Sequence, residues 1–186
     1  SGITLSTFAS DRGIRITSAR RPILRAQLEA LTPSEIADLY HRRFWQAARC
    51  HRMPASIALM HFDCAVNQGP GRAARLLQQA VGADVDGDIG PVTLSAVASA
   101  DPRETIERYA TLRKAAYRAL ASFSHYGRGW LSRLEKTRQA ALALTFDTQT
   151  STKEIKPMPT KPQSQAPKWW GRSITVWGVL ITALTA

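Results

Sequence analysis

The chain has 186 residues, enough for one well-packed domain with an appendage and too few for two large domains. Its apolar fraction of 44% and charged fraction of 21% are ordinary for a folded protein, which excludes a wholly disordered chain. The formal net charge of +11 is unusual, and it predicts attraction to polyanions such as nucleic acid, anionic lipid headgroups or acidic wall polymers.

Residues 1–31 begin with a β-prone stretch from Gly2 to Leu5 and continue through arginine-rich segments of weak pattern. From Thr32 the pattern is helical. Thr32-Pro33-Ser34-Glu35 fits a capping box with proline at the first helical position. Apolar residues then recur at spacings of three and four, which predicts one helix reaching to about Arg49.

The middle of the chain predicts a central buried helix from Pro54, because it is apolar nearly all round. Asn67-Gln68-Gly69-Pro70 is a strong stop signal for that helix. Two shorter helices are predicted next, one over 71–81 that ends at Gly82 and one over 91–100. The capping box Asp101-Pro102-Arg103-Glu104 predicts the start of a long helix. After a break at Gly127-Arg128-Gly129, a last helix is predicted from Trp130 to about Phe146.

The two cysteines, Cys50 and Cys64, are too few for a disulfide framework and have no partners at metal-ligand spacing. Both lie in apolar helical surroundings, so we interpret them as small buried side chains, with a bridge between them as the alternative. No metal and no cofactor is expected.

The C-terminal region differs in composition. Residues 147–167 are rich in Thr, Ser, Lys, Gln and Pro, which predicts a flexible linker. In residues 168–186, tryptophans and basic residues precede an apolar run that is shorter than the roughly 20 residues of a spanning helix. We interpret this segment as the start of a transmembrane anchor, with a buried helix or an amphipathic peptide as the alternatives.

The acidic loop from Asp84 to Pro91 has alternating aspartates, which suggests calcium. The spacing excludes it, because Ile89 and Ser95 stand where a calcium loop needs glycine and a carboxylate. The sequence instead predicts a turn in which aspartate side chains accept from nearby amides and Gly87 and Gly90 take left-handed geometry.

This loop belongs to a longer pattern typical of peptidoglycan-binding repeats, LQ followed by DGxxGPxT and an apolar residue. The pattern is carried by Leu77-Gln78, Gly82, Asp86-Gly87, Ile89-Gly90-Pro91, Thr93 and Val97, and it is flanked by Phe62 to Ala73, by Tyr40 with Phe44-Trp45, and by Gly127 to Trp130. Over about residues 1–140, the chain resembles glycoside hydrolase family 108, lysozyme-like enzymes of phages and bacteria whose C-terminal half is a peptidoglycan-binding region.

The resemblance implies a mainly α, lysozyme-like helical domain that hydrolyses the glycan strand between N-acetylmuramic acid and N-acetylglucosamine. Such chemistry needs a carboxylic acid that protonates the glycosidic oxygen. In the family this acid is the glutamate of an EGGY motif, which precedes a Gly-Ile-Thr strand. The sequence holds no EGGY and begins Ser1-Gly2-Ile3-Thr4, so we expect the catalytic glutamate upstream of Ser1 and no catalytic residue within the chain.

Retained carboxylates could serve instead, and Glu29, Glu35 and Asp63 are the candidates, Asp63 being the one nearest the matching motif. Substrate binding is expected from Thr4, on the strand that borders the cleft, and from Asp63, Asn67 and Gln68 at the end of the central helix. Helix capping is the alternative role for Asn67. Tyr40, Trp45, Tyr126 and Trp130 are either core residues or surfaces that stack on sugars.

The sequence therefore predicts four regions: the C-terminal part of the catalytic domain over 1–66, a peptidoglycan-binding-like helical region packed on it over 67–146, a linker over 147–167 and the anchor over 168–186. We expect a monomeric wall hydrolase associated with the bacterial inner membrane that acts on periplasmic glycan strands. Its membrane orientation stays open, because Lys168 and Arg172 favour the cytoplasmic side.

Two rival functions remain. A non-catalytic peptidoglycan-binding module fits the repeat pattern and the missing acid. A nucleic-acid-binding protein fits the charge, but the arginines are scattered and form no recognition motif, so no nucleic acid is expected as a partner.

Overall fold

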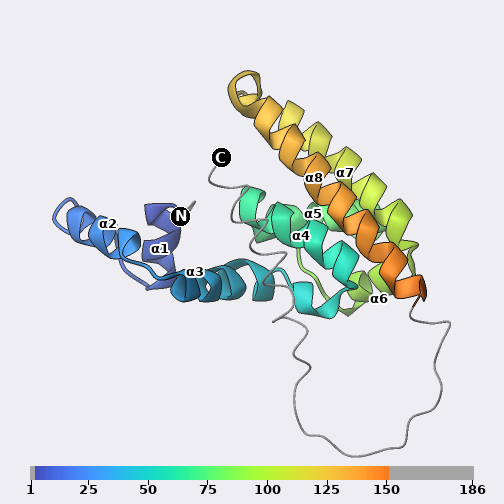
Figure 1. Ribbon diagram of the computed structural model, residues 1–186, viewed down its shortest axis with the longest axis horizontal. Coiled ribbons are helices and arrows are strands. Elements are labelled where there is room, and N and C mark those ends of the chain that lie inside the picture. Colours follow the sequence, from blue (N-terminus) through green and yellow to red (C-terminus); the bar gives the residue numbers. More distant parts are fainter. Residues whose placement is uncertain (1–2, 151–186) are drawn as a thin grey trace, which may run out of the picture. The chain divides into compact units, whose positions relative to one another are not determined.

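The computed structural model describes the backbone of residues 3–150 and the side chains of residues 3–145. Within this part every regular element is a helix and there is no strand, which confirms the mainly α fold (Figure 1). It divides into two compact units, residues 3–39 and residues 40–150. The helices are α1 Leu5–Asp11, α2 Arg21–Glu29, α3 Pro33–Tyr40, α4 Ala55–Gln68, α5 Pro70–Val81, α6 Pro91–Ser99, α7 Pro102–Arg118 and α8 Phe123–Thr150.

The N-terminal unit begins with a helix where the sequence predicted a strand. Thr4 is the N-cap of α1, and its hydroxyl accepts a hydrogen bond from the Thr7 amide at 3.1 Å. A side chain in that position satisfies an amide that the first helical turn leaves unpaired, and this local bond outweighs the β propensity of Ile3 and Thr4. The strand prediction is therefore wrong for the described residues.

The capping box of α3 is confirmed. The Thr32 amide donates to Glu35 Oε2 at 2.8 Å, and the Glu35 amide donates to Thr32 Oγ1 at 3.3 Å. The Thr32 hydroxyl also donates to Glu35 Oε2, at 2.8 Å, and the two bonds from the Thr32 amide and hydroxyl lower the pKa of the exposed Glu35 carboxyl, with the backbone bond as the larger cause. The Glu35 carboxylate therefore caps the N-terminus of α3.

The single helix expected to reach Arg49 is interrupted. After Tyr40 the backbone forms a π-helical segment, His41–Gln46, and Arg49 then adopts left-handed geometry with φ 54°. A π turn holds more residues than an α turn, so it rotates the side chains that follow. Here the Trp45 ring packs edge-on against Phe62 of α4, with 5.6 Å between centroids.

The central helix α4 is confirmed as buried. Its residues from Ser56 to Ala65 are all buried, and α4 contacts α5, α7 and α8. The predicted stop is confirmed as well, because Gly69 ends α4 at φ 84° and Pro70 starts α5. The thiols of Cys50 and Cys64 are buried and unbridged, and burial raises the pKa of both.

Helices α7 and α8 run side by side as a hairpin (Figure 1). The predicted break at Gly127-Arg128-Gly129 is wrong, because α8 begins at Phe123 and passes through both glycines. Gly127 has a packing role, since a Cβ there would meet the Phe123 ring at 2.6 Å.

Helix α8 extends to Thr150 and so includes the first residues of the predicted linker. The rest of the linker and the predicted anchor, 168–186, lie outside the described residues. Among the helices that the structure does describe, none combines the length and hydropathy needed to cross a membrane.

Candidate functional site

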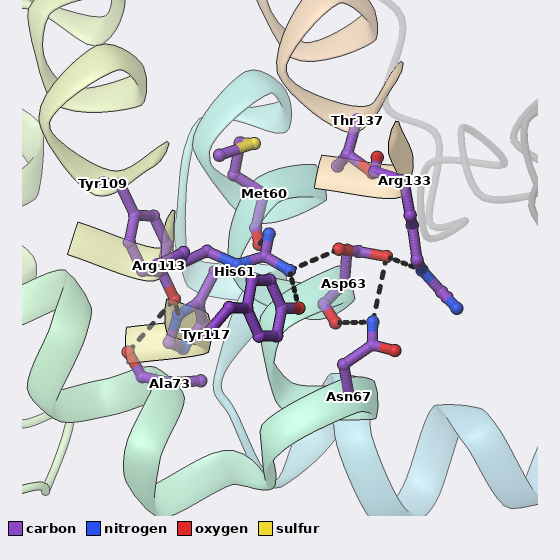
Figure 2. Close-up of polar contacts among 10 residues, drawn as sticks. All are labelled: Met60, His61, Asp63, Asn67, Ala73, Tyr109, Arg113, Tyr117, Arg133 and Thr137. Atoms are coloured by element: carbon purple, nitrogen blue, oxygen red, sulfur yellow. Dashed lines mark hydrogen bonds and ion pairs between the residues drawn. The ribbon is translucent and has the colours of Figure 1, made fainter. Parts of the chain in front are cut away.

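The candidate site is an ion-pair cluster at Asp63, on the buried helix α4 (Figure 2). Asp63 Oδ2 accepts from Arg113 Nη2 at 2.6 Å, and Asp63 Oδ1 accepts from Arg133 Nε at 2.8 Å. The side chains of Asp63 and Arg113 are fully inaccessible, whereas that of Arg133 is 21% exposed. One carboxylate thus holds two guanidinium groups, one in the core and one at the surface.

Arg113 lies on the inner face of α7. Its guanidinium also donates to the Met60 carbonyl at 3.3 Å and to the Tyr117 hydroxyl at 3.2 Å. Burial acts to lower the pKa of Arg113, but the charge of Asp63 holds it above its ordinary value. Arg113 therefore remains charged in the core and fixes the orientation of Asp63.

Asp63 was a candidate for both substrate binding and replacement catalysis. A general acid needs access to the oxygen it protonates. Both Asp63 oxygens instead bind guanidinium groups, and its side chain is inaccessible. This arrangement suits a residue that positions its neighbours.

Asn67 lies one helical turn after Asp63 and is exposed. Its amide donates to the Asp63 carbonyl at 2.6 Å and approaches Asp63 Oδ1 at 3.2 Å. The capping role considered for Asn67 is wrong, because the C-cap of α4 is Gly69, whose amide donates to the Ala65 carbonyl. The Asn67 amide nitrogen faces Asp63, and its amide oxygen points away from Asp63 (Figure 2).

Gln68 follows at the last position of α4. Both polar atoms of its side chain are buried and have no partner among the residues whose side chains are described. A buried amide without a partner costs about 1–3 kcal/mol, so this position favours a polar ligand or water. Thr4 lies in the N-terminal unit as an exposed N-cap, whereas Asp63, Asn67 and Gln68 belong to the other unit.

The repeat-like motif has a structural role, because hydrogen bonds from Gln78 of α5 hold the following loop. Gln78 is inaccessible, and its Nε2 donates to Asp86 Oδ1 at 2.6 Å and to the Asp88 carbonyl at 2.9 Å. Its Oε1 accepts from the Gly87 amide at 2.9 Å, and Asp86 accepts from the Asp88 amide at 2.8 Å. The turn prediction is confirmed for Asp86 and for Gly87, at φ 90°. It is wrong for Gly90, whose φ is −86° because Gly90 is the extended N-cap of α6.

The four candidate aromatics divide by exposure. Tyr40 is buried, and Trp45 and Trp130 are half-buried. Tyr126 is 62% exposed. Of these four rings, Tyr126 is therefore the one most open to contact from solvent.

Sequence reasoning missed Arg113, Arg133 and Tyr117. One signal was present for Arg113. It continues the apolar stripe of α7 at the helical spacing set by Ile106, Tyr109 and Tyr117. An arginine on a stripe of this kind requires a buried acidic partner.

Comparison with known proteins gives the family. Residues 1–69 match the family model described as glycosyl hydrolase 108, and residues 72–135 match that of a predicted peptidoglycan domain. The chain is similar to the solved structure of Brucella abortus SagA, with 34% identity and a TM-score of 0.69 over 77% of this chain and 78% of that chain. No curated protein matches the chain. These findings support a role in peptidoglycan hydrolysis or binding, and the chain belongs to glycosyl hydrolase family 108.

Proposed function

We propose that the chain binds peptidoglycan glycan strands as the body of a lysozyme-like hydrolase. The observation that carries this proposal is the succession of two family matches along one chain, a glycosyl hydrolase and a peptidoglycan domain. The net charge of +11 supports the same substrate, because bacterial walls carry acidic groups. The substrate-binding residues in this proposal are Thr4, Asn67 and Gln68, with Asp63 positioning its neighbours, and the chain acts as a monomer.

We further propose that the general acid is the glutamate of the family's EGGY motif, which the 186 residues do not contain. The retained candidates are poorly suited to the task. Glu35 is held by its capping box, Asp63 is bound by two arginines, and Glu29 is exposed in the last turn of α2. Residues 1–186 therefore bind the wall without cutting it.

The test incubates the chain with purified sacculi and measures both the co-sedimented fraction and new reducing ends. A second protein carries the family's EGGY segment before Ser1. We expect the chain to sediment with sacculi without producing reducing ends, and the extended protein to produce them.

Two results of that test would contradict these proposals. Reducing ends from residues 1–186 alone would overturn the assignment of the acid. Absence of sedimentation with sacculi, combined with tight and steeply salt-dependent binding to DNA, would replace the wall role with nucleic-acid binding.

We also propose that residues 168–186 attach the protein to the inner membrane, so that it acts on the periplasmic wall. Sequence supports this, because Lys168-Trp169-Trp170 and Arg172 precede an apolar run. Flotation with anionic vesicles tests it. The full chain should float and residues 1–167 should not, and equal flotation of both would contradict the anchor.

A further inference from the structure

One face of α8 combines stacked aromatic rings with an arginine. Tyr126, Trp130 and Arg133 occupy positions i, i+4 and i+7, which share a helix face. The Tyr117 and Trp130 rings stack with 5.4 Å between centroids and 30° between planes. The Trp130 and Tyr126 rings follow at 5.8 Å and 31°. The three rings form a ladder from the buried Tyr117 to the exposed Tyr126.

This ladder fixes the orientation of an exposed ring. Tyr117 is 4% exposed and hydrogen-bonded to Arg113, whereas Tyr126 is 62% exposed. An exposed aromatic ring leaves apolar surface in water, which is unfavourable unless a ligand covers it. A rigid tyrosine ring gives a large contact area at low conformational-entropy cost, which suits the flat apolar face of a sugar ring.

The same face carries a positive charge that the cluster does not neutralise. Asp63 is the carboxylate shared by Arg113 and Arg133, so these three groups sum to one positive charge. Arg133 approaches Asp63 through Nε, and its terminal nitrogens point away from Asp63 (Figure 2). A guanidinium held in this way presents its planar fork to a carboxylate.

We propose that this strip of Tyr126, Trp130 and Arg133 is a subsite for a carboxylated amino-sugar strand. A sugar ring stacks on Tyr126, and a wall carboxylate binds the outer nitrogens of Arg133. Helical rise places the two residues roughly 10 Å apart along α8, a span that one disaccharide with its carboxylated side arm covers. The inference rests on the proposed wall-binding function and adds the residues and the chemical groups that recognise the strand.

The test measures binding of the full chain to three insoluble polymers: native sacculi, sacculi with carboxylates converted to methylamides, and uncharged chitin. Tyr126→Ala removes the exposed ring, Tyr126→Phe keeps the stacking surface, and Val92→Ala changes an exposed apolar residue of α6 as a matched control. Arg133→Gln removes the charge. Thermal unfolding followed by circular dichroism checks that each variant is folded.

We expect Tyr126→Ala to weaken binding to native sacculi roughly tenfold, equivalent to about 1.4 kcal/mol. Tyr126→Phe and Val92→Ala should bind as the parent chain does. The parent chain should prefer native sacculi to the methylamidated form and to chitin, and Arg133→Gln should lose that preference.

Two results would overturn the subsite. Folded Tyr126→Ala that binds within twofold of the parent contradicts the stacking contact. Equal binding of the parent chain to native and methylamidated sacculi contradicts the carboxylate contact, whether or not Arg133→Gln folds. A parent chain that binds no sacculi at all is a different result, because it contradicts the proposed function itself.

Discussion

Replacing Asp63 with alanine removes the anion from a buried cluster and leaves Arg113 charged in the core. The side chains of Asp63 and Arg113 are both inaccessible and lie 2.6 Å apart. Breaking a buried pair by deleting one partner costs about 3–5 kcal/mol, because the other charge stays desolvated. Arg113 keeps its bonds to the Met60 carbonyl and the Tyr117 hydroxyl, so we expect the lower end, about 3 kcal/mol. The total free energy of unfolding of a domain is roughly 5–15 kcal/mol, so this loss is a large part of it.

Urea unfolding at pH 7 measures the loss, and the double variant Asp63→Leu with Arg113→Met identifies its cause. If an uncompensated charge is responsible, the double variant is more stable than Asp63→Ala, since no charge remains buried. Glu135→Ala is the matched control. It breaks a half-exposed pair with Arg138 and should change stability little. A loss below about 1 kcal/mol for Asp63→Ala, or a double variant less stable than either single change, refutes the reasoning.

Three further predictions concern stability. Gln78→Leu should lower the free energy of unfolding by about 2–3 kcal/mol, because it leaves the Gly87 amide without its acceptor and removes the bond that Gln78 donates to Asp86; an unchanged melting temperature would contradict the structural role of Gln78. Burial lowers the pKa of His61 to about 4 from 6.5, so the unfolded chain binds more protons between these values and stability falls as pH drops from 6.5 toward 4, by up to about 3 kcal/mol. Urea unfolding at pH 7.5 and 4.5 should show a smaller fall for His61→Gln, and an equal fall would exclude His61 as its source. Gly127→Ala should destabilise the fold by about 1 kcal/mol through the Phe123 ring, whereas Gly129→Ala, which meets open space, should stabilise α8; circular dichroism melts that reverse this order would contradict the packing role.

Local signals were sufficient for most of the helix boundaries. Thr32, Asp101, Gly69 and Gly82 all cap helices as their neighbours predict, because each acts on amides or carbonyls within four residues. The predictions failed where a distant contact or a side-chain contact determines the course of the backbone. Gly127 was interpreted as a breaker, but it makes room for the Phe123 ring inside α8.

The candidate site was harder to predict than the fold. The motif drew attention to Asp63 and Asn67, but their partners come from α7 and α8. Arg113 is 50 positions from Asp63 and Arg133 is 70 positions away, and nothing in the local pattern pairs residues at such separations. The repeat motif identified the family correctly. Its residue Gln78, however, is buried and hydrogen-bonds the loop from Asp86 to Asp88.

The position of α4 constrains how proteins of this kind can be recombined. The glycosyl hydrolase match ends at residue 69, just after α4. Helix α4 nevertheless packs against α5, α7 and α8, and the 72–135 match covers most of α5, all of α7 and the first part of α8. A gene fusion cut at Gly69 would separate the buried segment from Ser56 to Ala65 from the surface that covers it. A transferable wall-binding module therefore has to carry α4 with it, and its genetic boundary lies before Ala55, although the similarity boundary lies after Gln68.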